Sequence, residues 1–365
     1  MTTIAKLLPK KIISRLLFDN NANFNYHAYL PVLNTIKDAQ PKIPANFKGN
    51  DLLLFQRVLS QFREQTHTIN PQLLDVEFNL IEIAAERGSR DALTTLSFMV
   101  LNCNNSWPKE DVASAKEFIK KLIKMDHPLV FKLSGDWELF AHKFPLEIPK
   151  SDRQLPLEST QTPLLSQITD NSEQFQKAVS FYKKFLTLDS NSTVAGSALR
   201  SLGLIYFKNG DLCAAQQYFL KSTNLSTSYQ NAMANYFLGI LSEHDPLLSR
   251  HYLELSAAEG FKDSFANLGY LELNVFDDIK KALEWFKLGS ELGVPEAMVG
   301  VFDVNVKRGD WRSASNTMLR MKKYGFSNIL HKSRADRVKQ VKNKVKELDE
   351  AFELESESLE NSRWN

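Results

Sequence analysis

The chain is poor in cysteine and lacks the common motifs of metal and nucleotide chemistry. Its 365 residues include two cysteines, Cys103 and Cys213, which are too few for a disulfide framework or a four-thiolate zinc site. The seven histidines are scattered, and none occurs in a His-Glu-x-x-His sequence. No Gly-x-Gly-x-x-Gly or Gly-x-x-x-x-Gly-Lys-Ser/Thr sequence is present, which argues against a Rossmann or P-loop nucleotide site.

A nucleophilic active site is not expected either. A cysteine nucleophile needs a histidine base close to it. Cys213 stands beside two alanines, where a packed helix residue is expected, and Cys103 follows an apolar helical pattern. We therefore expect no enzyme activity, and no catalytic, cofactor-binding or metal-binding residues.

The chain has no excess of charge of one sign. It carries 45 basic and 43 acidic residues, for a net charge of +2. A protein that holds nucleic acid through its phosphates needs a basic field or face. DNA binding is therefore not expected, and RNA binding is disfavoured.

Long apolar runs are missing as well. The uncharged stretch of residues 92–108 is apolar only as far as Leu101, whereas a membrane-spanning helix needs about 20 mostly apolar residues. We therefore expect any membrane contact to be peripheral. The apolar face of residues 4–18 and the proline-rich segment 144–172 are the candidate contacts.

Acids are absent from the first eighteen residues. This segment carries Lys6, Lys10, Lys11 and Arg15 among apolar residues, and the first acid is Asp19. A basic, amphipathic, acid-free start is typical of mitochondrial presequences, so residues 1–18 are interpreted as one. The alternative is an ordinary basic helix of the first domain.

Proline and glycine divide the chain into regions. Eleven of the 13 prolines occur at or before Pro163, and eleven of the 14 glycines lie between Gly196 and Gly325. Closely spaced prolines exclude a continuous helix between Phe144 and Ser172. The expected regions are an N-terminal helical region over 19–143, a linker or surface loop over 144–171, repeats over 172–331 and a charged helix and tail over 332–365.

An internal repeat occupies the second half of the chain. Leu-Gly pairs recur at Gly203, Gly239 and Gly269, with a weaker Val-Gly pair at Gly300, so the intervals are 36, 30 and 31 residues. Small residues let facing helices approach closely, and aromatic residues later in each copy fill the gap to the next pair of helices. One such pair cannot bury its apolar face alone, so several must stack.

This pattern resembles the tetratricopeptide repeat and the related Sel1-like repeat. The best copy runs from Ala198 to Ser222, with leucine, glycine, aromatic and alanine residues at the signature spacings. In the third copy Glu272 replaces the usual aromatic residue. Gly210 followed by Asp211 fits a turn in which glycine ends one helix and aspartate caps the next.

The repeat predicts an all-α fold, an α-solenoid of tetratricopeptide/Sel1-like helix pairs with a charged C-terminal helix. In the first half, the expected helices are 71–87, 90–102, 109–125 and 128–141. In the second half, they are 172–188, 194–208, 212–224, 229–243, 247–259, 263–274, 278–291, 295–308, 311–324 and 332–355.

Solenoids of helix pairs hold segments of other proteins on the concave surface formed by the first helix of each pair. Polar and aromatic positions on these helices are therefore candidate contacts for a protein or peptide client. They are Arg200, Tyr206, Asn235, Asn267 and Tyr270. The sequence predicts a non-enzymatic protein-binding factor.

Residues 71–135 carry a second resemblance. The run Ala-Ala-Glu-Arg-Gly-Ser-Arg-Asp-Ala at 84–92 precedes His-Pro-Leu-Val-Phe-Lys at 127–132. With the presequence-like start and the repeats, the chain is similar to a family of yeast mitochondrial factors for export of the C-terminal tail of cytochrome c oxidase subunit 2. The resemblance implies a peripheral protein on the matrix side of the inner membrane, with the oxidase subunit and the export machinery as partners in respiratory-complex assembly.

Two other functions stay open. A mitochondrial RNA-binding or translation-associated factor would use the run 332–346, which holds seven bases and one acid. However, residues 347–360 hold seven acids and no base, and such a helix is interpreted as mostly solvated. A cytosolic Sel1-type scaffold would require that residues 1–18 are retained.

The N-terminal interpretation predicts mitochondrial import. A reporter fused to residues 1–40 is expected to enter mitochondria, because its first acid follows four bases spaced among apolar residues. Fractionation or imaging of the fusion measures its location. A reporter that stays in the cytosol would contradict the interpretation.

Overall fold

The computed structural model describes residues 8–36, 43–66, 70–102, 107–140, 172–225 and 231–362, with side chains as far as residue 350. Within these ranges the chain forms seventeen helices and no strand. The predicted all-α solenoid fold is confirmed, and the helices predicted from residue 71 onward lie within about three residues of their predicted bounds, except the last, which begins five residues earlier and ends seven residues later than predicted. The chain divides into two compact units, unit 1 (residues 1–208) and unit 2 (residues 209–365).

The helices of unit 1 in the described ranges are α1 (Lys10–Asp19), α2 (Tyr26–Thr35), α3 (Gly49–Thr66), α4 (Pro71–Glu86), α5 (Arg90–Asn102), α6 (Lys109–Lys124), α7 (Pro128–Leu139), α9 (Ser172–Leu188) and α10 (Thr193–Lys208). Those of unit 2 are α11 (Leu212–Thr223), α12 (Ala232–Leu241), α13 (Pro246–Ala258), α14 (Lys262–Asn274), α15 (Ile279–Glu291), α16 (Pro295–Lys307), α17 (Trp311–Lys323) and α18 (Ser327–Ser362).

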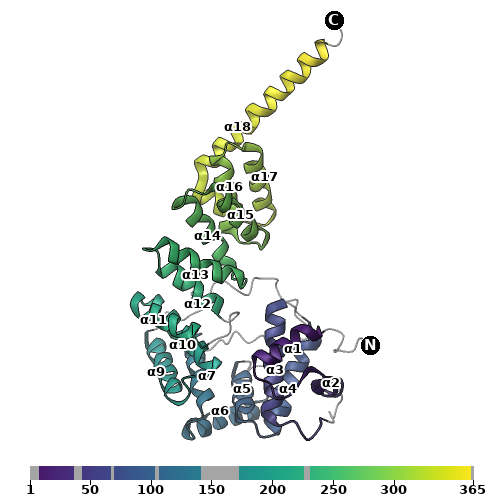
Figure 1. Cartoon of the computed structure of the whole chain (residues 1–365), viewed down its shortest axis with the longest axis vertical. Helices are drawn as coiled ribbons and strands as arrows, with labels where there is room; N and C mark the ends of the chain where they lie inside the picture. The colour runs from purple at the N-terminus through teal and green to yellow at the C-terminus, as the bar shows by residue number, and fades with distance from the viewer. Residues whose placement is uncertain are drawn as a thin grey trace. The chain divides into compact units, whose positions relative to one another are not determined.

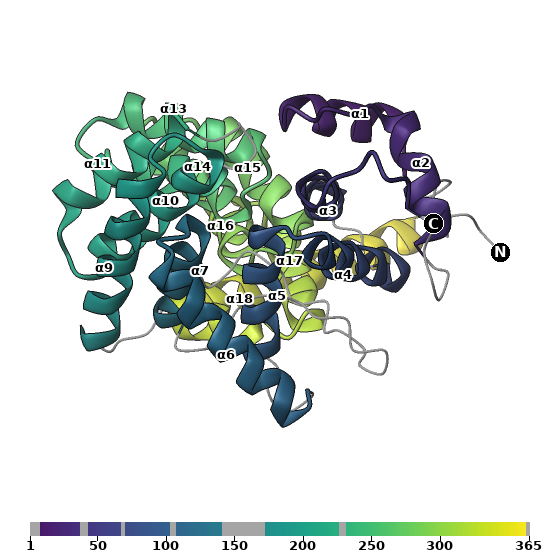
Figure 2. The ribbon, with the colours of Figure 1, turned by 90° about the horizontal axis from the view of Figure 1, so that it is seen from below.

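The first four helices share one hydrophobic core (Figure 2). Tyr29 of α2 stacks on Phe55 of α3 with ring centroids 4.0 Å apart, and Ile13 and Leu17 of α1 are buried in the same cluster. Residues 10–19, which overlap the segment interpreted as a presequence, thus contribute an apolar helix face to unit 1. The presequence stays a prediction, and residues 1–7 lie outside the described residues.

The helices on either side of the proline-rich segment pack against each other. Gly135 of α7 faces the ring of Tyr182 of α9, and the Tyr182 hydroxyl donates a 2.7 Å hydrogen bond to Asp136. Both helices belong to unit 1, so the intervening segment joins packed helices of one unit, and the division between units follows Lys208. The expected linker 144–171 itself lies outside the described residues.

In unit 2, each second helix of a pair begins at an aspartate cap. The capping side chain accepts a hydrogen bond of 3.0–3.1 Å from the backbone N–H three residues later, and the four caps are Asp211, Asp245, Asp278 and Asp310. Each such cap contributes about 1 kcal/mol to helix stability. Gly210 and Gly309, directly before two of the caps, have positive φ angles of 81° and 71°, as the sequence predicts for these turns.

Glycines on the first helices of the pairs admit large side chains from the second helices. The Phe286 ring of α15 is fully buried between Gly269 of α14 and Gly300 of α16. A Cβ atom would lie 2.4 Å from this ring at Gly269 and 2.2 Å from it at Gly300. The repeated glycines are therefore positions of close helix approach, and α12 to α17 stack in chain order (Figure 1).

Replacing Gly300 with alanine is expected to destabilise unit 2. The added methyl group would overlap the Phe286 ring, and overpacking of this kind typically costs about 1–3 kcal/mol. That loss exceeds the roughly 1 kcal/mol that alanine gains over glycine within a helix. Urea unfolding of the full chain, followed by circular dichroism, should show a lower midpoint for Gly300→Ala.

The matched control places Gly300→Ala in a Phe286→Ala background. Alanine at position 286 lacks Cγ and the ring atoms that meet the new Cβ, so Gly300→Ala should be neutral or stabilising there. An equal loss of stability in both backgrounds would show that the ring is not responsible.

Candidate functional site

The first helices of unit 2 and the start of α18 share a line of polar residues, here named the first-helix face. It comprises Tyr236 on α12, Asp263, Asn267 and Tyr270 on α14, Glu296 and Asp303 on α16, and Arg334 and Arg337 on α18. A side-chain hydrogen bond joins Asn267 to Tyr236. The Tyr270 hydroxyl donates a 3.4 Å hydrogen bond to the backbone oxygen of Glu296. The contacts thus pass from one first helix to the next.

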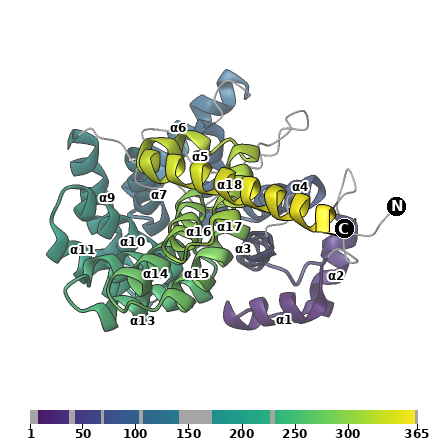
Figure 3. The same cartoon turned by 90° about the horizontal axis from the view of Figure 1, so that it is seen from above.

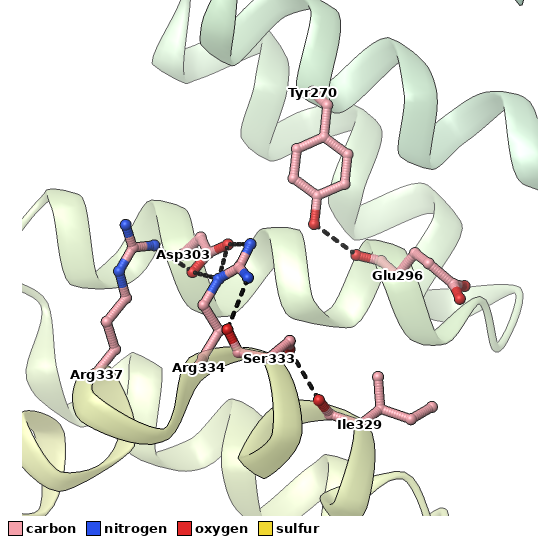
Figure 4. A network of polar contacts seen from close by, with 7 residues as sticks. All are labelled: Tyr270, Glu296, Asp303, Ile329, Ser333, Arg334 and Arg337. Carbon is pink, nitrogen blue, oxygen red and sulfur yellow. Dashed lines mark hydrogen bonds and ion pairs between the residues drawn. The ribbon is translucent and has the colours of Figure 1, made fainter.

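Asp303 is the centre of this face (Figure 4). Its side chain is only 6% exposed. Arg334 Nε donates to both carboxylate oxygens at 2.9 Å, and Arg337 Nη1 donates to one of them at 2.5 Å. A carboxylate buried to this extent needs charged partners, because an uncompensated buried charge is strongly destabilising.

Arg334 also marks a break in α18. Its backbone angles, φ −139° and ψ 33°, are not helical, so α18 consists of two helical stretches joined at this residue. Arg334 Nη1 donates to the backbone oxygen of Ser333, and the Ser333 hydroxyl donates to that of Ile329 (Figure 4). The predicted charged C-terminal helix is present, but it begins at residue 327 and breaks where the Arg334 side chain reaches Asp303.

A pocket of about 350 Å³ opens beside Asp303 between α14, α16 and α18. Three cations, one carboxylate, one phenol, one amide and two apolar side chains line it: Lys307, Arg334, Arg337, Asp303, Tyr270, Asn274, Leu273 and Val306. The cations outnumber the carboxylate, so the pocket is positively charged at neutral pH. Lys307 pairs with the exposed Asp277 at 3.0 Å, a surface contact that contributes at most about 1 kcal/mol.

The part of the first-helix face that lies outside the pocket is acidic, because it carries Asp263 and Glu296. Burial, together with the charge of nearby Glu296, raises the pKa of Asp263 to about 6. Burial and the Asp263 charge raise the pKa of Tyr236, and burial and the Asp303 charge raise the pKa of Tyr270 to about 12. At neutral pH both tyrosines are therefore neutral hydrogen-bond donors, and the acidic part is charged.

The candidate groove residues from the sequence fall into different surroundings. Tyr270 lines the pocket, and Asn267 hydrogen-bonds to the neighbouring first helix, so the structure brings these two together. Asn235 of α12 is 6% exposed, and its side chain is not available to a ligand in this structure. Arg200 and Tyr206 are half-buried on α10 of unit 1 and do not line the pocket. Burial lowers the pKa of Arg200 to about 10.

Three residues of the face, Asp303, Arg334 and Arg337, are not among the sequence candidates. The sequence holds one signal for Asp303, because a lone acid in the apolar helix segment 297–306 must be buried and therefore paired. Both arginines belong to the basic run 332–346. Which of its seven bases reach Asp303 depends on the break in α18, and helical periodicity does not reveal that break.

A second buried ion pair accounts for the departure of the third repeat copy from the tetratricopeptide pattern. Glu272 of α14 is 1% exposed and accepts a 2.6 Å hydrogen bond from Arg250 of α13. The Arg250 guanidinium also lies 3.8 Å from the centre of the Phe276 ring. A charged contact between helices thus occupies the place of the usual aromatic residue.

One of the two cysteines lies within the described residues. Cys213 lies on α11 as expected, but it is exposed, and Ala215 is the packed small residue at this turn. Cys103 lies outside the described residues. In the part of the chain that the structure describes, no three His, Cys, Asp or Glu side chains gather closely enough to hold a metal ion.

Comparison with known proteins identifies relatives of both halves of the chain. Residues 2–89 match the family model of the MSS2 N-terminal domain, and residues 198–229 match a tetratricopeptide repeat. The chain is 30% identical over 359 residues to Protein MSS2, mitochondrial, of Saccharomyces cerevisiae. That match covers 92% of this chain and 93% of the yeast protein.

Two solved structures resemble the chain at low sequence identity. PilF of Pseudomonas aeruginosa is 14% identical, with a TM-score of 0.46 over 66% of this chain and 93% of its own. A signal transduction ATPase with a tetratricopeptide repeat sensor, from Pyrococcus horikoshii, is also 14% identical. Its TM-score is 0.46, over 92% of this chain and 50% of its own.

The ion pairs of Asp303 predict that replacing its carboxylate with a neutral amide strongly lowers the stability of unit 2. Asp303→Asn keeps the shape of the side chain but leaves two arginines without their carboxylate. Breaking a buried ion pair typically costs about 3–5 kcal/mol of folding stability. We expect a somewhat smaller loss here, about 2–4 kcal/mol, because Arg337 is half-exposed. Urea unfolding measures this loss, and hydrogen exchange should become faster in residues 327–341.

Asp277→Asn is the matched control for this substitution. Asp277 also pairs with a cation lining the pocket, but it is 82% exposed. Its replacement should change stability by less than about 1 kcal/mol. Equal effects of the two substitutions would contradict the special role of Asp303.

Proposed function

The chain belongs to the family of the mitochondrial protein MSS2, and on this premise we propose that it is a non-enzymatic assembly factor that binds a protein segment on its first-helix face. The membership of this family and the match to a tetratricopeptide repeat support a helical-repeat protein-binding factor of mitochondrial origin. The client in this proposal is cytochrome c oxidase subunit 2. The factor assists export of the C-terminal tail of that subunit across the inner membrane.

The observation that carries the proposal is the pocket beside Asp303 on the first-helix face. Packed helices lie about 8–10 Å apart, and an extended chain advances about 3.3 Å per residue. A bound segment therefore places roughly every third residue against a new first helix. Tyr236, Asn267 and Tyr270 offer polar groups along this path, and the pocket with its apolar Leu273 receives a side chain.

A mitochondrial RNA-binding factor is the second candidate function. The exposed bases of residues 332–346 and the positive pocket favour it. Asp263 on the same face would repel phosphate groups, because with a pKa of about 6 its carboxyl is mostly ionised at neutral pH. A protein segment carries both signs of charge and suits such a mixed face better.

The proposed location is the matrix side of the inner membrane, with the export machinery as a second partner. The yeast relative is named as mitochondrial. Among the helices in the described ranges, none combines the length and the apolar character that a bilayer-crossing segment requires. The proposal therefore includes a peripheral contact with the membrane. It disagrees with the alternative of a cytosolic scaffold that retains residues 1–18.

Site-specific photocrosslinking tests the proposal. The full chain carries p-benzoylphenylalanine at Asn274, which lines the pocket, or at Lys287, which is exposed on α15. Both versions replace the relative in yeast mitochondria, where newly made mitochondrial proteins are radiolabelled. We expect an adduct with cytochrome c oxidase subunit 2 from position 274 and a much weaker one from position 287.

Charge reversal of a pocket residue sharpens this test. Lys307→Glu removes a cation from the pocket rim without touching the Asp303 pairs, and it should reduce the adduct at position 274 by about tenfold, since a charge-assisted contact is worth about 1.5–3 kcal/mol. Adducts of equal strength at both positions, or none with subunit 2, would contradict the proposed client. An adduct that ribonuclease removes would favour the RNA-binding candidate instead.

A further inference from the structure

The last helix of unit 2 separates its charges by sign along its length. The basic segment, residues 332–346, holds seven bases and one acid, and the acidic segment, residues 347–360, holds seven acids and no base. α18 runs on to Ser362, past the end of α17. Figures 1 and 3 show no other helix of unit 2 beside its last turns.

The apolar side of α18 is used within unit 2, and its basic side faces outward. Val338 and Val341 are buried in a cluster with residues of α16 and α17. Lys339 and Lys342 are exposed on the same stretch. The basic segment is therefore a fixed outer surface of unit 2.

This order of charges is unfavourable for a helix on its own. The helix dipole favours acids near the N-terminus and bases near the C-terminus, and α18 has the reverse. Its pairs Lys344–Glu347 and Lys346–Glu350 place the base before the acid, which is the weaker orientation. Stability of the isolated helix therefore does not explain the pattern.

Within one helix the two segments pair only where they meet, at Lys344–Glu347 and Lys346–Glu350. Their centres are roughly 14 residues apart, or about 21 Å along the axis at about 1.5 Å per residue. Screening at physiological salt limits such interactions to about 8 Å. Lys342, Glu353 and Glu357 have no opposite charge three or four residues away in the sequence. These charges therefore have no partner along α18 itself, and a second molecule with the complementary charge pattern would supply one.

We propose that α18 pairs antiparallel with α18 of a second copy of this chain. In this arrangement the acidic segment of each copy lies along the basic segment of the other, so the same charge contacts form twice about a two-fold axis. The axis passes near residue 346, where Leu348 is 40% exposed. Val345 packs against the hydrophobic cluster of unit 2, so Leu348 supplies the apolar contact at the centre of the pair.

A second copy fits the pattern better than other occupants. Nucleic acid or anionic lipid would match the basic segment but would be repelled by the acidic segment next to it. A second copy matches both segments at once, because the five bases of the basic segment that do not pair with Asp303 meet the acids of the other copy's acidic segment. The pairing does not rest on the proposed client.

Sedimentation velocity of the full chain tests the pairing. We expect a dimer at about 50 mM salt and an association constant at least about tenfold lower at about 500 mM salt, because exposed ion pairs are screened. The variants Lys339→Glu/Lys342→Glu and Glu353→Lys/Glu357→Lys should each lower the constant at low salt by at least about tenfold. Circular dichroism confirms that each variant keeps its helix content.

The mixture of the two variants is the decisive measurement. Residues 332–360 then carry a net charge of −5 in one variant and +3 in the other, so each repels a copy of itself, and an equimolar mixture should form a heterodimer. Lys280→Glu/Lys287→Glu, which changes the same number of exposed charges on α15, should leave the native dimer intact. A chain that is monomeric at both salt concentrations, or variants that do not pair when mixed, would overturn the proposal. Binding of the monomer to transfer RNA or to cardiolipin-containing vesicles through Lys339 and Lys342, without dimer formation, would also overturn it.

Discussion

The ion pairs between Asp303 and the two arginines of α18 determine most of what unit 2 presents to a partner. They fix the start of α18 against α16, and the chain breaks its helical course at Arg334 where this contact forms. They also form one wall of the pocket and set the direction in which the rest of α18 leaves the unit. A buried carboxylate with two partners is a demanding arrangement, because the loss of one member leaves the others uncompensated.

The glycine contacts of the repeat provide the rigid support on which this arrangement rests. Phe286 fills the space between Gly269 and Gly300, so α14 and α16 are held at a fixed separation by a single ring. The aspartate caps fix where each second helix begins. Because Tyr270 and Asp303 stand on these two first helices, the same packing that stabilises unit 2 positions the polar groups of its binding face.

The parts of the structure that could be predicted from sequence are those with local or periodic causes. Helix bounds from residue 71 onward and the Gly-Asp turns follow from spacing and capping. The Asp303 and Arg334 contact joins residues 31 positions apart, and no local pattern encodes it. Adjacent residues point about 100° apart around a helix, so an error of one position places a side chain on the wrong face. The sequence candidate on α12 was Asn235, which is buried, whereas its neighbour Tyr236 belongs to the first-helix face.

The central claim is that the first-helix face of unit 2 binds an extended protein segment. Hydrogen–deuterium exchange of the full chain, with and without a recombinant C-terminal tail of cytochrome c oxidase subunit 2, tests it most directly. The account predicts slower exchange in α14, α16 and the first turns of α18, and little change in α13, α15 and α17. Slower exchange confined to the second helices, or no slowing at saturating concentrations of the tail, would contradict the claim that the first-helix face binds the segment.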